Sequence, residues 1–195
     1  MGNKVPTRLE AYDLLKEYTK TESLISHALA VEAVMLHFAE LFNEPDKEKW
    51  GVIGLIHDID YEMYPDEHCV KVREILTENN YPEEYIHGVV SHGWGLCVDV
   101  EPVHKMEKVL YTIDELTGLI TATALLRPSK SVLDLTPKSV KKKWGQKSFA
   151  SGVNREVIEK GAGLLGMELT TIIDETIKGM QTVADSIGLK GEVAL

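Results

Sequence analysis

The sequence predicts an all-α protein, and three observations support this fold class. Apolar residues recur every three or four positions through most of the 195-residue chain, as they do along one face of an amphipathic helix. Several such stretches begin with capping signals, the first being the capping box of Thr7 and Glu10. No stretch shows the strict apolar–polar alternation typical of a half-buried strand. We therefore expect a bundle of helices.

Three helices are expected in the first third of the chain, over residues 7–18, 22–42 and 47–57. The second carries an apolar stripe with His27 on its edge, whereas His37 is rotated away from that stripe and is expected to face solvent. The third, after the N-cap candidate Asp46, is apolar nearly all round, as a central buried helix should be. It ends in the pair His57-Asp58.

Further helices are expected around 68–79, over 82–92 and over 102–126. The last is long, with Val103 on its inward face and Asp114 in its middle. Residues 127–151 are basic and predict a loop, and helices over 154–165 and 168–187 follow. We expect one domain, with a helical core over 1–126 and the remaining residues, 127–195, packed on the same domain.

Charge is distributed unevenly along the chain. The net charge of −10 argues against generic nucleic-acid binding, yet residues 127–160 hold nine Lys or Arg against three acids. Such a segment is either a solvated face or a surface that steers an anionic substrate. If it folds across a cleft, four of its residues are candidates to bind phosphate: Arg127, Lys130, Lys143 and Arg155.

Composition bounds the location of the protein. The longest uncharged stretch that suggests a membrane span, 116–126, is far shorter than the ~18 residues that a span needs, so no transmembrane helix and no membrane partner are expected. The N-terminus lacks the apolar core of a signal peptide. Cys69 and Cys97 are too few for a disulfide framework and are interpreted as ordinary small residues. These features indicate a cytoplasmic protein.

Four polar side chains are candidates for one inward-facing cluster: His27, His57, Asp58 and Asp114. Burial of each would be costly without a partner, and a metal ion supplies both charge and geometry. Two imidazoles with two carboxylates form a mixed nitrogen and oxygen set. That set suits Fe, Mn, Co, Ni or Zn, and Mg less well.

This ordered His, His-Asp, Asp pattern resembles the signature of the HD-domain superfamily of metal-dependent phosphohydrolases. The resemblance covers about residues 20–126 and implies an HD-domain-like helical bundle with a C-terminal helical extension. It implies one or two divalent ions held by His27, His57, Asp58 and Asp114. His68 and His92 fall where two-metal members place extra ligands, and Asp58 would then bridge the ions.

The chain departs from the common His-Asp-Ile-Gly-Lys form of the motif. Here the run is His57-Asp58-Ile59-Asp60-Tyr61, so the glycine and the phosphate-contacting lysine are absent. Three other histidines are expected outside the cluster. His87 faces away from His92 on a helix, and His37 and His104 are expected at the surface.

The resemblance implies a hydrolase that attacks a small phosphate ester, a nucleotide or related metabolite, with metal-activated water. The catalytic candidates are Asp58 and, beyond it, Asp60 or Glu62, which would orient ligands or relay protons. Whether the substrate is a monoester or a diester is open. The alternatives are a di-iron oxygenase on the same scaffold and a nucleotide-binding regulator without turnover. The last two helices either cover the cleft or form a homodimer surface.

Overall fold

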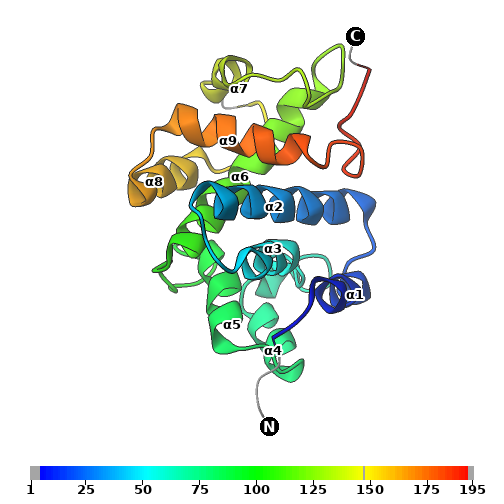
Figure 1. Cartoon of the computed structure of the whole chain (residues 1–195), viewed down its shortest axis with the longest axis vertical. Coiled ribbons are helices and arrows are strands. Elements are labelled where there is room, and N and C mark those ends of the chain that lie inside the picture. Colours follow the sequence, from blue (N-terminus) through cyan, green and yellow to red (C-terminus); the bar gives the residue numbers. More distant parts are fainter. Residues whose placement is uncertain (1–4, 147, 193–195) are drawn as a thin grey trace.

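The computed structural model describes residues 5–146 and 148–192 and confirms the all-α class (Figure 1). No strand occurs in these residues, apart from an isolated bridge between Trp94 and Val98. Two short 3-10 helices, η1 (Pro65–Glu67) and η2 (Ser91–Gly93), interrupt the α-helices. The α-helices are α1 (Arg8–Tyr18), α2 (Glu22–Leu41), α3 (Lys47–Ile56), α4 (Lys71–Glu78), α5 (Glu83–Val90), α6 (Lys105–Leu125), α7 (Pro137–Trp144), α8 (Arg155–Leu165) and α9 (Leu169–Gln181).

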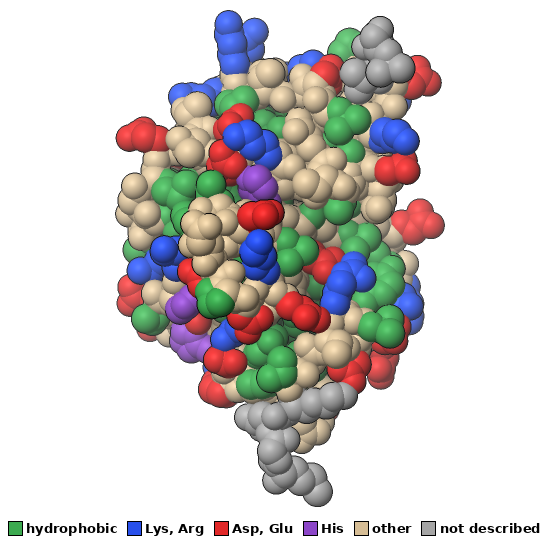
Figure 2. Space-filling model, viewed as in Figure 1, with side chains coloured by type: hydrophobic (Ala, Val, Ile, Leu, Met, Phe, Trp, Pro, Cys, Tyr) green, Lys and Arg blue, Asp and Glu red, His purple; other side chains and the backbone are tan. Residues whose placement is uncertain are grey.

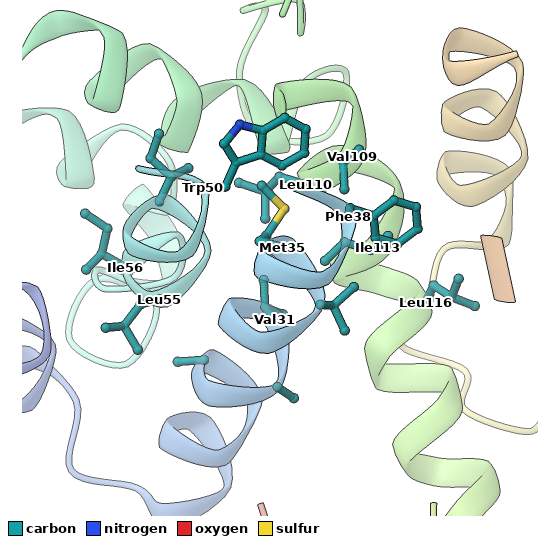
Figure 3. Packing of buried hydrophobic residues seen from close by; sticks show 14 of the residues in the cluster. Val31, Met35, Phe38, Trp50, Leu55, Ile56, Val109, Leu110, Ile113 and Leu116 are labelled. Carbon is teal, nitrogen blue, oxygen red and sulfur yellow. The ribbon is translucent and has the colours of Figure 1, made fainter. Parts of the chain in front are cut away.

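Helix α2 lies at the centre of the bundle. It packs against α3 on one side and α9 on the other, and α6 crosses behind it (Figure 1). Figure 3 shows Val31, Met35 and Phe38 of α2 between side chains of α3 and α6, among them Leu55 and Ile113. All five side chains are fully buried. The apolar stripe predicted for α2 is therefore the axis of the core.

Two glycines allow helices to approach α2 closely. A Cβ at Gly54 of α3 would lie 2.8 Å from Cγ of Met35, and a Cβ at Gly179 of α9 would lie 2.8 Å from Cα of Val34. Contacts this short are not tolerated, and at Gly179 the obstructing atom belongs to the backbone. The absence of a side chain at these positions therefore sets the spacing of α3 and α9 from α2.

Three histidines make structural contacts outside the predicted cluster. His37 was expected to face solvent, but α9 covers it, and its Nε2 lies 2.6 Å from Oε2 of Glu175. His87 pairs with Glu107 at 2.8 Å, and His104 caps α6 by accepting a hydrogen bond from the Met106 amide. These three histidines therefore lie apart from the other four, which are His27, His57, His68 and His92.

The region after α6 differs from the expected loop. Residues 137–144 form α7, which begins with Pro137 and with a hydrogen bond from the Ser139 amide to the Thr136 hydroxyl. Basic residues obscured this helix because they leave only Val140 buried. Helix α6 itself begins at Lys105, so Val103 lies before the helix and is 71% exposed rather than inward. Helix α8 packs on α6, and α9 packs on α2.

Helix α2 is long and apolar enough, by length and composition, to cross a membrane, which the sequence analysis did not anticipate. It is the only helix of the described residues with these properties. Half of its most apolar window is buried against the surrounding helices. Its apolar character is accounted for by its place at the centre of the core.

The close approach of α9 to α2 generates a stability prediction. Gly179→Ala should lower the free energy of unfolding by about 1 to 3 kcal/mol, because the new Cβ would meet the backbone of Val34. Gly163→Ala in α8, where a Cβ meets nothing within 4 Å, should raise it by roughly 0.5 to 1 kcal/mol. Urea unfolding measures both variants; equal midpoints would contradict the prediction.

Candidate metal centre

Helix α3 delivers His57 and Asp58 to the centre of the molecule. The helix is buried from Trp50 to Ile56, and His57 follows it as the C-cap, fully buried. The Nδ1 atom of His57 lies 2.8 Å from the carbonyl oxygen of Gly54. Because a carbonyl oxygen only accepts, Nδ1 donates and carries the hydrogen. In the neutral ring Nε2 then has a free lone pair.

The first group of donor atoms comes from three parts of the chain. His27 projects from α2, His57 and Asp58 follow α3, and Asp114 lies in the middle of α6. Oδ1 of Asp114 lies 2.9 Å from Nε2 of His27 and 3.2 Å from Nε2 of His57. One donor atom from each of the four residues lies within 4.8 Å of all the others. The group is therefore compact enough to hold one metal ion.

A second group is built around His68 and His92, whose Nε2 atoms lie 3.3 Å apart. His92 donates from Nδ1 to the carbonyl oxygen of Val89 at 2.5 Å. His68 places Nδ1 2.8 Å from Oδ1 of Asp60. With both Nδ1 atoms engaged as donors, the two neutral rings would face each other with lone pairs. A proton or a metal cation between the rings resolves this conflict.

Asp58 takes part in both groups. Its Oδ1 lies 3.5 Å from Nε2 of His68 and 3.4 Å from Nε2 of His92. Its Oδ2 lies 3.4 Å from Nε2 of His57 and 3.8 Å from Nε2 of His27. Each oxygen of one carboxylate thus faces a different pair of imidazoles. This is the arrangement that a ligand shared between two ions requires.

The electrostatics of the cluster favour a cation. Burial lowers the pKa of His57, but the carboxylates of Asp58 and Asp114 outweigh burial and hold that pKa well above its usual value. Burial raises the pKa of Asp58, but His57 and His92 outweigh it and hold the pKa well below the usual range. The carboxylates are therefore ionised and attract positive charge. A bound metal would replace the imidazole protons, because metal ligands must be deprotonated.

The donor types narrow the choice of metal. Imidazole nitrogens with carboxylate oxygens suit Fe, Mn, Co, Ni and Zn, whereas Mg and Ca prefer oxygen ligands alone. The residues present therefore fit a divalent transition metal. Which of these metals the protein binds stays a prediction.

Asp60 acts on the metal centre through His68. It is fully buried, its Oδ1 meets Nδ1 of His68, and its Oδ2 accepts a hydrogen bond from the amide of Val72 at 2.8 Å. These two contacts fix the ring of His68 with Nε2 turned toward Asp58. Such outer partners orient ligands and raise their basicity.

Glu62, the other catalytic candidate beyond the His-Asp pair, has a different place. Its Oε2 accepts hydrogen bonds from the amides of Lys20 and Thr21 at 2.9 and 3.1 Å. These amides precede α2, so Glu62 fastens the loop after α3 to the start of α2. It does not line the cavity of the metal centre. Its predicted catalytic role is corrected to a structural one.

A cavity of about 410 Å³ opens onto the cluster. Five of the six predicted metal ligands line it, and His57 lies beneath them, fully buried. None of the lining residues is Lys or Arg. The other residues of the wall are Tyr61, Pro65, Gly93, Leu96, Cys97, Glu115, Gly118 and Val153.

The basic residues proposed to bind substrate lie elsewhere. Arg127 forms a two-pronged ion pair with Asp134, at 3.2 and 2.7 Å, and lines a separate cavity of about 340 Å³ with Lys143. Arg155 donates to the carbonyl oxygen of Phe149 at 2.7 Å, and Lys130 is exposed. Arg127 lies just beyond the C-terminal end of α6, about three turns from Asp114, whereas Arg155 begins α8 and also donates to the carbonyl oxygen of Val153, a residue of the cavity wall. None of the four lines the cavity of the metal centre, and their contact with substrate stays a prediction.

The two cysteines are closer to the centre than expected. Cys69, in a left-handed backbone conformation (φ 66°), places Sγ 3.8 Å from Nε2 of His92 and 2.9 Å from Sγ of Cys97. A Cβ at Gly93 would collide with both sulfur atoms. With His68 and His92, Cys69 forms a further group able to hold a metal ion. A thiolate ligand would favour a softer ion such as Zn.

Glu115 is a wall residue that the sequence analysis missed. Its carboxylate accepts a hydrogen bond from the Asn154 amide at 2.9 Å. Burial and the nearby carboxylate of Asp114 raise the pKa of Glu115, against the effect of that hydrogen bond. Its position next to Asp114 was the one feature of the sequence that could have placed Glu115 at the metal centre. The contact itself depends on where α8 begins in space.

The contact between Asp60 and His68 generates a prediction about metal affinity. Asp60→Asn leaves one oxygen for two N–H donors, so either the His68 ring or the Val72 amide loses its acceptor. We expect metal affinity to fall by about 10- to 100-fold. Asp66→Asn, at an exposed position of η1 before His68, is the matched control and should not change affinity. Chelator competition measures both; equal affinities in folded protein would refute the positioning role.

The comparison with known families agrees with this geometry. The model of the HD domain family matches residues 24–136, which is more than half of the chain. All six predicted metal ligands lie inside the match, and α7, α8 and α9 lie outside it. No solved structure matches the chain. The extent of the family match, with the His, His-Asp and Asp residues gathered in one cluster, shows that this chain belongs to the HD domain family.

Proposed function

We propose that this protein is a metal-dependent phosphohydrolase that acts on a small phosphate ester. Membership of the HD domain family implies the superfamily of metal-dependent hydrolases. One observation carries the finer proposal: the two oxygens of Asp58 face two separate groups of imidazoles at the floor of a cavity. This arrangement suits a pair of ions acting on one phosphate group.

The metal would supply two kinds of chemistry when bound, a nucleophilic water at neutral pH and neutralisation of the phosphate oxygens. The residues that would hold it are His27, His57, Asp58 and Asp114, with His68 and His92 at a second position. Cys69 is a further candidate ligand at that second position.

The protein's own residues would orient the imidazole rings and hold the protons on their Nδ1 atoms. The carbonyl oxygens of Gly54 and Val89 accept the Nδ1 hydrogens of His57 and His92, so both Nε2 atoms stay turned to the carboxylate of Asp58. Asp60 does the same for His68. The buried walls around these rings limit their movement. Pre-organised ligands of this kind need no rearrangement when substrate arrives.

Phosphate recognition would depend on the metal centre. No Lys or Arg of the described residues lines the cavity, so phosphate recognition would not depend on an ammonium or guanidinium group there. On the face shown in Figure 2, Lys and Arg side chains are interspersed with Asp and Glu rather than gathered in one patch. A substrate with a single phosphate group, matched to the metals, fits this surface better than a polyanion does.

Two other functions are alternatives to phosphate ester hydrolysis, and specific measurements distinguish them. A di-iron oxygenase would contain iron, consume oxygen and release no phosphate. A nucleotide-binding regulator would gain thermal stability from its ligand without forming product under any metal. We also propose a cytoplasmic location and no membrane or nucleic-acid partner. A homodimer stays an alternative to the monomer.

Metal content tests the two-ion arrangement. Elemental analysis of freshly purified wild type should find about two ions per chain. His68→Ala should retain about one, and Asp58→Ala little, because Asp58 faces both groups. His37→Ala is a matched control, since His37 binds Glu175 away from the cavity, and it should keep the wild-type content. Absence of metal even after reconstitution would refute the proposal.

Phosphate release tests the chemistry. Wild-type protein reconstituted with Mn, Co or Fe should release phosphate from simple phosphate esters. His57→Ala removes a buried ligand and should lower kcat/KM more than about 100-fold, beyond the effect typical of outer partners. Oxygen consumption by the iron form without phosphate release would instead support the oxygenase.

A further inference from the structure

A second cavity of about 480 Å³ lies beside the metal centre. Its walls come from the first half of α2, from the second half of α6 and from residues 187–189 near the end of the chain. The last of these three walls lies outside the region that matches the HD domain family. This cavity is therefore not a feature of the matched region alone.

The second cavity adjoins the cavity of the metal centre. His27 and Gly118 line both. The His27 ring, whose Nε2 faces Asp114, stands at the boundary. Gly118 has no side chain to separate the two cavities. A Cβ there would have one neighbour within 4 Å, Cγ2 of Val153 at 3.5 Å. A molecule with its phosphate at the metal centre would have to pass this boundary, between His27 and Gly118, to enter the second cavity.

The C-terminal wall, residues 187–189, buries two of its side chains and is hydrogen-bonded to the rest of the fold. Ile187 and Leu189 are 7% and 3% exposed. The amide of Leu189 donates to the carbonyl oxygen of Ala184 at 2.8 Å, and its own carbonyl oxygen accepts from the amide of Val132 at 2.9 Å. Gly188, between the two side chains, has a φ of 69°, which glycine adopts readily.

The lining is apolar with a few neutral hydroxyl groups. Hydroxyls come from Ser23, Ser26 and Thr121, and the one charged residue is the acid Glu22, which is exposed at the start of α2. No Lys or Arg lines this cavity either. An anionic group placed here would meet Glu22 without a compensating cation, and any buried charge would lose its hydration. An uncharged apolar group would bury its surface favourably.

We propose that this second cavity binds the alcohol part of the substrate and selects phosphate esters whose alcohol is uncharged and largely apolar, such as an aromatic ring system. The inference rests on the proposed function, since the phosphate must lie at the metal centre. It names the substrate class that the metal ligands leave undefined. Phosphate esters of charged alcohols are disfavoured, and so are esters that carry a second phosphate group.

Thr121→Phe fills the cavity from α6 and tests the proposal. Thr121 is partly exposed, so a larger side chain there can be accommodated outside the core, and the variant is expected to fold. Thr171→Phe, at an exposed position of α9 outside the cavity, is the matched control. The substrates are 2-naphthyl phosphate, with a large apolar alcohol, and phosphoethanolamine, with a small charged one.

In the wild type kcat/KM should be at least about 10-fold higher for 2-naphthyl phosphate than for phosphoethanolamine. Thr121→Phe should lower this ratio at least about 10-fold, and Thr171→Phe should leave it within about 2-fold. A ratio near one in the wild type, or an unchanged ratio in Thr121→Phe, would overturn the inference while leaving the phosphohydrolase intact.

Binding of 2-naphthol, the product alcohol, tests the cavity without turnover. Calorimetry on metal-loaded protein should detect binding to the wild type and to Thr171→Phe, and at least about 10-fold weaker binding to Thr121→Phe. If no ester is hydrolysed but this difference is found, the proposed function fails and the apolar site stands. Equal binding to the two variants would overturn the site itself, and melting curves would show that both variants are folded.

Discussion

The carboxylate of Asp58 faces imidazoles from four separate segments of the chain. These segments are α2, the end of α3, the loop before α4, and η2. Imidazoles and carboxylates gathered at low exposure are costly unless a cation compensates them. The apolar core around α2 holds the segments in place, and a metal ion would remove the remaining electrostatic conflict. Bound metal would thus link to folding mainly through Asp58, the residue that both groups share.

The chain beyond the family match contributes to both cavities, through Val153 before α8 and through residues 187–189 after α9. Helix α8 packs on α6 and places the Asn154 amide against Glu115, beside the metal centre. Helix α9 packs on α2 through Gly179 and the His37–Glu175 contact, and the chain after it closes the second cavity. The matched region therefore holds the ligands, and the added helices shape the space in which a substrate would lie.

The position of charge in the sequence is a poor guide to its position in space. Arg127 of the basic segment after α6 is used locally, in the ion pair with Asp134, and no Lys or Arg of the segment lines the cavity of the metal centre. Neither cavity has a Lys or Arg among the described residues that line it. Charge selection would then rest on the metals for the phosphate and on exclusion of charge for the remainder of the substrate.

The sequence by itself determined the helical class and the buried α3, because these depend on local periodicity. Polar residues within apolar stretches singled out His27, His57, Asp58 and Asp114 as candidate ligands, and the family resemblance added His68 and His92. The sequence did not reveal α7, the contact of Cys69 with His92, or the place of Glu62. Only the tertiary structure decided these, together with the second cavity. They depend on which helix surfaces meet, and a one-residue change in helix start or packing redirects a side chain by about 100°.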